Sequence, residues 1–93
     1  MDKKKLQIAR NKIDNLDNRF LLLIKERTNL VNQVIKIKKY KNQIVDNVRI
    51  NKVLRNIRTK SIKMNIDPMI SKRIWTTMIK SYIEYEKKKF KKK

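Results

Sequence analysis

An unbroken amphipathic pattern over the first part of the chain restricts it to helical folds. Apolar residues recur every seven positions in two interleaved rows. These rows are Leu6, Ile13, Phe20 and Val34, and Ala9, Leu16, Leu23, Leu30 and Ile37. Such a repeat is typical of a helix that presents one apolar seam to other helices. Because no glycine or proline interrupts the pattern, we expect one helix from about Lys3 to Tyr40, with Asp2 favourably placed at its start.

The rest of the chain predicts two further helices. A polar connection over residues 41–45 leads to Asp46, a residue type that commonly caps helix N-termini. The apolar pattern of this second helix ends near Asn65. Asp67 followed by Pro68 marks the start of a third helix, because proline fits the first helical position. We therefore predict an all-α chain of three helices.

The length of the chain indicates one domain that needs a partner. The 93 residues form no internal repeat and are expected to make a single helical domain, residues 1–93. The first helix would be roughly 55 Å long at ~1.5 Å per residue, whereas a compact domain of this size is about 25 Å across. The remaining residues cannot cover the whole seam, so a second copy of the chain is its natural cover.

Composition excludes several kinds of chemistry. The sequence has no cysteine and no histidine, so disulfide scaffolds, thiol nucleophiles and the usual zinc sites are not expected. It has no glycine, which argues against phosphate-binding glycine loops. We expect no metal and no cofactor. No apolar run approaches the ~20 residues of a membrane span, and residues 1–5 lead into an amphipathic pattern, so we expect a soluble cytoplasmic protein.

The net charge of +19 invites a nucleic-acid-binding interpretation. Lysines are spread along the whole chain, however, with clusters only at the two ends, and no row of aromatic side chains is suited to stacking bases. We read most lysines as a solvated face and Lys87–Lys93 as a frayed basic tail. We do not expect a nucleic-acid partner, although a noncatalytic polyanion-binding protein remains the alternative of another class.

Arg27 interrupts the first apolar row. A guanidinium in a seam needs a carboxylate partner or an anionic ligand, because its desolvation costs several kcal/mol. Lys38 follows after eleven residues, about 20° around the helix and roughly 16 Å along it, so both side chains can reach one ligand. Arg10 is too distant on the same chain. In an antiparallel pair with its dyad near Arg19, position 10 of one chain falls opposite position 27 of the other.

Charged and apolar positions at long separations carry a family resemblance. They are Leu6-x-x-Ala9-Arg10-x-x-Ile13-Asp14-x-Leu16-Asp17, Leu23-Ile24-x-Glu26-Arg27, Val34-x-x-Ile37-Lys38, Asp46-x-x-Arg49 with Val53-Leu54, and Ile66-Asp67-Pro68. This pattern, which covers nearly the whole chain, resembles the all-helical (AroQ-type) chorismate mutase family. The resemblance implies an intertwined antiparallel homodimer of three-helix chains, with two active sites that convert the dianion chorismate to prephenate without a cofactor.

The resemblance also implies roles for individual residues. Arg10 is the arginine donated across the dimer interface, and Arg27 binds a substrate carboxylate. Lys38 contacts a carboxylate and the ether oxygen. Asp46 and Arg49 fall where the family lines the hydroxyl side of the pocket. Each position also has a structural alternative, because Arg27 can pair with a carboxylate, Asp46 can serve only as a cap, and Arg49 can be a surface cation.

Three positions depart from the typical family pattern. Glu86 stands where many members have glutamine as a donor to the ether oxygen, and a glutamate can donate only when protonated. We therefore predict that activity declines as Glu86 loses its proton at higher pH. Ile50 replaces a glutamate that binds the substrate hydroxyl, and Tyr82 replaces a serine. These last two residues are similar to those of isochorismate pyruvate-lyase, a salicylate-forming enzyme of the same fold, which is the alternative function.

Overall fold

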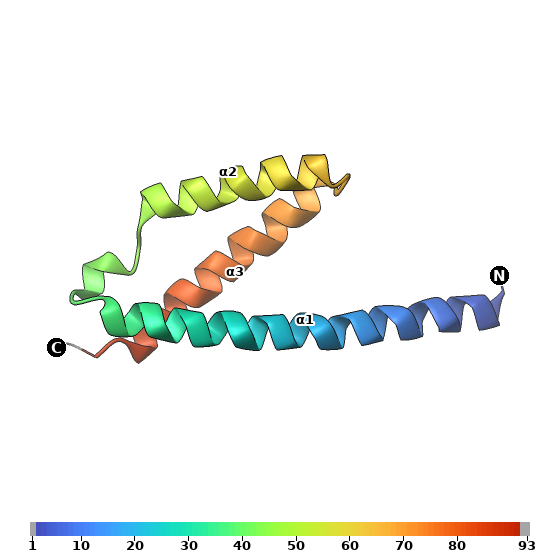
Figure 1. The fold of residues 1–93 in the computed structure, drawn as a ribbon, viewed down its shortest axis with the longest axis horizontal. Helices are drawn as coiled ribbons and strands as arrows, with labels where there is room; N and C mark the ends of the chain where they lie inside the picture. The colour runs from blue at the N-terminus through green and yellow to red at the C-terminus, as the bar shows by residue number, and fades with distance from the viewer. Residues whose placement is uncertain (1, 92–93) are drawn as a thin grey trace. The chain divides into compact units, whose positions relative to one another are not determined.

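The computed structural model describes residues 2–91, and Figure 1 shows the order of their helices. The helices are α1 (Lys3–Ile37), the short 3-10 helix η1 (Lys41–Gln43), α2 (Asn47–Lys63) and α3 (Pro68–Lys89). Residues 2–91 contain no strand. The prediction of an all-α chain with three main helices is therefore confirmed. The chain divides into two compact units, Met1–Gln33 and Val34–Lys93, and each is described by itself.

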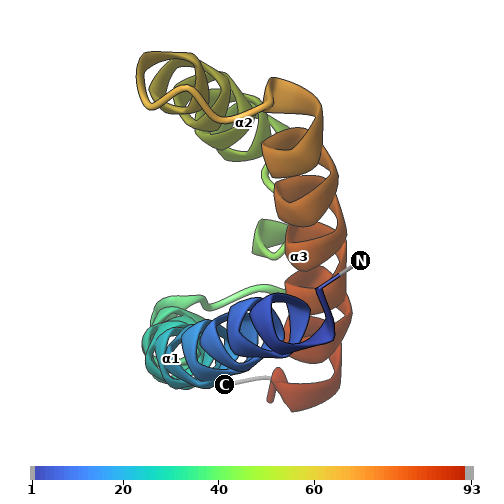
Figure 2. The same ribbon diagram turned by 90° about the vertical axis from the view of Figure 1, so that its right-hand side faces the viewer.

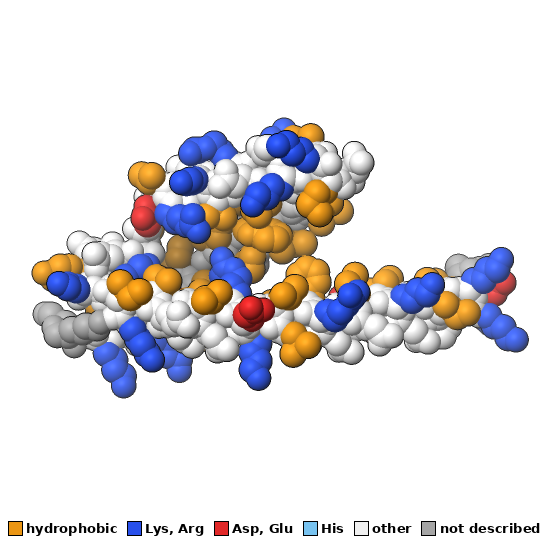
Figure 3. Space-filling view, viewed as in Figure 1, with side chains coloured by type: hydrophobic (Ala, Val, Ile, Leu, Met, Phe, Trp, Pro, Cys, Tyr) orange, Lys and Arg blue, Asp and Glu red, His pale blue; other side chains and the backbone are white. Residues whose placement is uncertain are grey.

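The first unit consists of α1 up to Gln33. Asp2 caps the helix, since its Oδ1 accepts a hydrogen bond from the backbone N–H of Lys5 at 3.1 Å. Most of the predicted seam lies at the surface, and Figure 3 shows hydrophobic side chains along α1. Leu23 is 61% exposed and Leu30 is 55% exposed. The local pattern thus forms the predicted helix, and a large part of its apolar face has no cover within one chain.

The first helix ends at Ile37, three residues before the predicted Tyr40. This early end of α1 has a local cause. The side-chain Oε1 of Gln43 accepts hydrogen bonds from the backbone N–H groups of Lys39, at 2.8 Å, and Tyr40, at 2.9 Å. These two donors therefore do not continue the hydrogen bonding of α1. The short helix η1 follows within residues 41–45, which were predicted to be an irregular connection.

In the second unit, α3 turns back from the end of α2 and packs against it (Figures 1 and 2). Both predicted caps are confirmed. Asp46 Oδ1 accepts from the N–H of Arg49 at 3.0 Å, and Asp67 Oδ1 accepts from the N–H of Met69 at 2.9 Å. Pro68 occupies the first turn of α3, as expected.

The second helix stops at Lys63, two residues before the predicted end, because Asn65 adopts the left-handed conformation with φ = 58°. In this conformation the N–H of Ile66 donates to the carbonyl of Ser61 at 2.9 Å, which satisfies a helix-end acceptor. Asparagine tolerates this region better than most residues, and the sequence has no glycine to use instead. This turn sets where α3 begins its return.

Small side chains lie buried near the turn between α2 and α3. Ser61 is 4% exposed and Ser71 is 6% exposed. The hydroxyl of Ser61 donates to the carbonyl of Ile57 at 2.6 Å, so its burial leaves no unpaired donor. Both residues belong to the pair of helices, α2 and α3, that pack against each other. The buried hydrophobic residues of the second unit, Ile35 and Ile44, lie further along, at the end of α1 and beside η1.

Helix α3 extends into the basic C-terminal segment. Helix α3 continues through Lys89, and the N–H of Phe90 donates to the carbonyl of Glu86 at 2.8 Å. The predicted frayed tail, Lys87–Lys93, is therefore helical over its first three residues, and positions 92–93 lie outside the described residues. Within residues 2–91, no helix combines the length and the apolar character that crossing a bilayer requires.

Candidate active site

The last turn of α1 positions Lys38. Its backbone N–H donates to the carbonyl of Val34 at 3.1 Å, so Lys38 continues the direction of the helix by one residue. The next two N–H groups are held by Gln43, as described above, which fixes the chain directly after Lys38. Gln43 was not among the residues predicted for the site. Gln43 follows Tyr40 by three residues and Lys39 by four. This short spacing is typical of a side chain that holds a turn, and it could have indicated the role of Gln43.

Glu86, near the end of α3, lies opposite Lys38. The Nζ of Lys38 is 3.4 Å from Oε2 of Glu86, and the two residues are 48 positions apart in the chain. The side chains are only 20% and 10% exposed, respectively. Glu86 is the one buried charged residue among residues 2–91. The structure therefore brings together the two residues predicted to be catalytic.

Helix dipoles act on the two partners in opposite senses. Lys38 follows the C-terminus of α1, where the partial negative charge of the helix favours a cation. Glu86 lies in the last turn of α3, where the same effect disfavours a carboxylate. Lys38 and the basic residues that end α3 offset this cost.

Asp46 and Arg49 lie together at the start of α2. The carboxylate of Asp46 accepts from the backbone N–H of Arg49, and both side chains are exposed. In the described part of the chain, neither forms an ion pair with Lys38 or Glu86. The structure therefore assigns Asp46 a capping role and leaves the guanidinium of Arg49 at the surface of the single chain.

Ile50 and Tyr82 are both half-buried, on α2 and α3 respectively. Tyr82 lies one turn before Glu86, and its ring packs edge-on against Tyr85 with the ring centroids 6.3 Å apart. The Nζ of Lys89 lies 5.9 Å from the centre of the Tyr85 ring. Tyr85 was not among the predicted site residues, although its spacing of three from Tyr82 and four from Lys89 places all three on one helix face.

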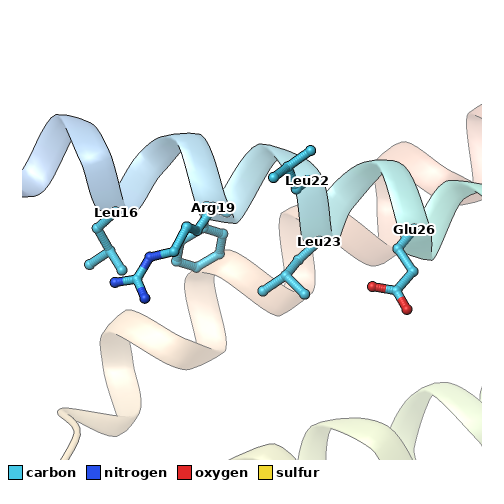
Figure 4. A pocket seen from close by; sticks show the side chains of 6 residues that line it. Leu16, Arg19, Leu22, Leu23 and Glu26 are labelled. Carbon is cyan, nitrogen blue, oxygen red and sulfur yellow. The ribbon is translucent and has the colours of Figure 1, made fainter.

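The other two predicted site residues, Arg10 and Arg27, belong to the first unit. Arg10 is exposed, whereas Arg27, the charged residue within an apolar row, is half-buried. A shallow hollow lies between these two positions, lined by Leu16, Arg19, Phe20, Leu22, Leu23 and Glu26. In Figure 4, Leu16, Arg19, Leu23 and Glu26 project to one side of α1 and Leu22 to the other. Because all six residues come from one helix, the hollow is open helix surface and not an enclosed site.

The residues present are poorly suited to metal chemistry. The sequence has no cysteine or histidine, and within residues 2–91 no three carboxylates gather into a possible metal site. Cations and hydrogen-bond donors dominate the predicted site residues instead. This set is suited to binding anions through guanidinium and ammonium groups.

Comparison with known families decides the relationship that the residue pattern indicated. The model of the family described as chorismate mutase type II matches residues 9–87. The chain belongs to this family. The match spans α1 from Ala9 onward, η1, α2 and nearly all of α3, so it includes every predicted site residue. Comparisons with curated proteins and with solved structures gave no match.

Proposed function

We propose that the protein is a chorismate mutase, which rearranges chorismate to prephenate. The observation that carries the proposal is the family match over residues 9–87, with Lys38 and Glu86 meeting inside the matched region. The reaction breaks one C–O bond as one C–C bond forms, so it needs no nucleophile, metal or cofactor. Catalysis then consists of holding the reactive conformer and stabilising the negative charge that develops on the ether oxygen.

The proposed residue roles follow this chemistry. Chorismate carries two carboxylates, and arginine binds carboxylates through two parallel hydrogen bonds that fix orientation as well as charge. Arg27 and Arg10 of the partner subunit are proposed to bind them. Lys38 is proposed to contact a carboxylate and the ether oxygen, and a protonated Glu86 to donate a second hydrogen bond to that oxygen. Asp46 and Arg49 are proposed to bind on the hydroxyl side of the substrate.

A homodimer is part of the proposal. Two features of α1 support it: the exposed seam needs a cover, and Arg10 and Arg27 exchange places about a dyad near Arg19. Desolvating the apolar side chains of two long helices is a large favourable contribution to association. Each site of such a dimer would take a residue from both subunits.

Isochorismate pyruvate-lyase is the second candidate function. Ile50 cannot accept a hydrogen bond from a substrate hydroxyl, as the glutamate of typical mutases does, and Tyr82 adds bulk where they have serine. Both residues are half-buried, on the two helices that pack together in the second unit. The same anion-binding residues could hold isochorismate while pyruvate is eliminated to give salicylate.

One assay separates these functions. Purified protein is incubated separately with chorismate and isochorismate, and the products are identified by chromatography. Prephenate from chorismate supports the mutase, whereas salicylate from isochorismate as the main product supports the lyase. No turnover of either substrate by folded, dimeric protein would reject both. In that case, salt-dependent binding of DNA or RNA would favour the noncatalytic polyanion-binding alternative.

A further inference from the structure

The fold brings together two lysine-rich segments of the second unit. Residues 36–41 run from the end of α1 into η1, and residues 87–89 end α3. The ion pair between Lys38 Nζ and Glu86 Oε2, at 3.4 Å, joins them, and Figures 1 and 2 show the last turns of α3 beside the end of α1. Six exposed lysines lie within three positions of one member of this pair. We call these residues the lysine patch: Lys36, Lys39, Lys41, Lys87, Lys88 and Lys89.

The lysine patch carries an excess of positive charge. Lys38 and Glu86 neutralise each other as a pair, and Glu84 is the one further carboxylate within three positions of either residue. Six lysines and one glutamate leave an excess of five positive charges around the pair. The wider distribution is also uneven, since residues 34–93 contain 19 lysines and arginines and four acidic residues, whereas residues 1–33 contain eight and four. Most of the net charge therefore belongs to the unit that holds Lys38 and Glu86.

The lysine patch is close enough to act on an anion at Lys38 without touching it. Consecutive Cα atoms are about 3.8 Å apart, so each patch residue has its Cα within about 11 Å of the Cα of Lys38 or Glu86. The Debye length is about 10 Å at an ionic strength of about 0.1 M and longer in more dilute salt. Below about 0.1 M, the charges of the patch thus act together on such an anion.

We propose that the lysine patch attracts dianionic substrates to Lys38 and favours them over ligands of lower charge. This inference rests on the proposed function and gives a role to residues outside the predicted site. It applies equally to chorismate and isochorismate, because both carry two carboxylates. The attraction scales with the charge of the ligand, so a dianion gains twice as much free energy as a monoanion and a neutral molecule gains none.

Long-range attraction has a kinetic signature that direct contact does not share. The field of the patch acts on the bound substrate and on the transition state nearly alike, because the rearrangement or elimination takes place at one position in this field. Such uniform stabilisation raises kcat/KM and leaves kcat almost unchanged. Added salt screens the field, so the advantage in kcat/KM should disappear as the ionic strength rises.

Steady-state kinetics of the whole protein at increasing ionic strength tests the inference. The substrate is chorismate or isochorismate, whichever the protein turns over, and the ionic strength rises from about 0.02 M to about 0.5 M with sodium chloride. We expect kcat/KM of the wild type to fall at least about tenfold over this range, within the span typical of electrostatic attraction. The value of kcat should change by less than about twofold.

Two triple variants that remove the same number of charges locate the effect. The patch variant combines Lys39→Gln, Lys41→Gln and Lys87→Gln. At about 0.02 M it should have a kcat/KM at least about threefold below wild type, and the two proteins should converge at about 0.5 M. The control also neutralises exposed lysines of the second unit, and Lys72 lies about 21 Å from Glu86 along α3. It combines Lys60→Gln, Lys63→Gln and Lys72→Gln, and its kcat/KM should stay within about twofold of wild type.

Several outcomes overturn the inference. An active protein whose kcat/KM does not respond to salt rejects it and leaves the proposed function intact. Equal losses in the two triple variants would assign the effect to net charge, and a loss in the patch variant that persists at about 0.5 M would assign it to a direct contact. No turnover of either substrate by folded protein rejects the proposed function and the inference with it.

A pair of single variants decides the question if the patch variant does not fold, as judged by circular dichroism. Lys88→Glu and Lys72→Glu each change the charge of α3 by two at an exposed position, the first inside the lysine patch and the second outside it. We expect Lys88→Glu to have the lower kcat/KM at about 0.02 M, by at least about twofold, with kcat unchanged. Equal values of kcat/KM for the two variants would overturn the inference.

Discussion

Arg27 places a guanidinium at a position of the seam where the repeat requires an apolar side chain. The residue is half-buried and lies within the region that the family model matches. In the proposed function it binds a substrate carboxylate, which helps to compensate the cost of desolvating a guanidinium.

We expect Arg27→Ala to lower kcat/KM by at least ~100-fold, as removal of one charged donor from an active site commonly does. Stability should stay equal or rise, because the fold no longer has to desolvate a guanidinium in an apolar seam. Steady-state kinetics and thermal unfolding measure the two effects. Arg58→Ala, which removes an exposed arginine from α2, is the control and should keep full activity. Activity of Arg27→Ala within tenfold of wild type would contradict the role of Arg27.

Glu86 gives the second prediction at this scale. Since only the protonated side chain can donate to the ether oxygen, turnover of the wild type should fall as pH rises and Glu86 ionises. The profile of Glu86→Gln should be flatter, because an amide keeps its donor at every pH. Initial rates across the pH range test this, with Glu84→Gln as the matched control. Indistinguishable profiles for wild type and Glu86→Gln would reject the role of Glu86.

At the scale of elements, helix ends do most to set the geometry of the second unit. Gln43 binds the backbone just after α1, and Asn65 lies at the turn that ends α2. Asp46 and Asp67 cap the N-termini of α2 and α3. Each acts through a few local hydrogen bonds. Two of these ends, at Asp46 and Asp67, carry residue types whose preference for helix N-termini is strong enough to predict from the sequence. The other two depend on backbone conformations that many residues can adopt.

Asp46 allows capping and substrate binding to be separated. Asp46→Ala should lower the free energy of unfolding by about 1 kcal/mol, because the N–H of Arg49 loses its acceptor. Asp46→Asn keeps an acceptor oxygen and should retain nearly full stability. If the carboxylate also binds substrate, both variants should raise KM. Chemical denaturation and steady-state kinetics measure the two properties, and an unchanged KM for Asp46→Asn would restrict Asp46 to capping.

At the scale of the whole molecule, the exposed seam of α1 is the feature that bears on dimer formation. A single chain leaves Leu16, Leu23 and Leu30 about half exposed or more. The proposed dimer would cover this surface and supply each site with Arg10 of the partner subunit. Sedimentation analysis should accordingly find a dimer at micromolar concentration.

Subunit complementation tests the shared site directly. Arg10→Ala and Arg27→Ala homodimers should each be inactive, because every site lacks one arginine. In a mixed dimer, one site combines intact Arg27 with intact Arg10 of the partner subunit, and the other site lacks both. After unfolding and refolding an equal mixture, half of the dimers are mixed, so activity should recover to about one quarter of wild type. Activity that stays at the level of the single variants would contradict a site shared between subunits.

The local features of this fold could be predicted from the sequence by itself. Periodicity over residues 6–37 defined α1, and Asp46, Asp67 and Pro68 defined the starts of α2 and α3. These features depend on interactions within about one helical turn, which the neighbouring residues specify. The spacing of charged residues was also sufficient to indicate the family that the comparison then showed.

Only the tertiary structure decided that Lys38 and Glu86 form an ion pair across 48 positions. The chain between them includes the left-handed turn at Asn65 and the packing of α3 against α2. No periodicity encodes this proximity, because the packing of α3 against α2 joins residues that are distant in the sequence, and the turn at Asn65 depends on a backbone conformation that the residue type alone does not specify. A glutamate in a row of lysines reads as solvated surface until the fold buries it beside one particular lysine.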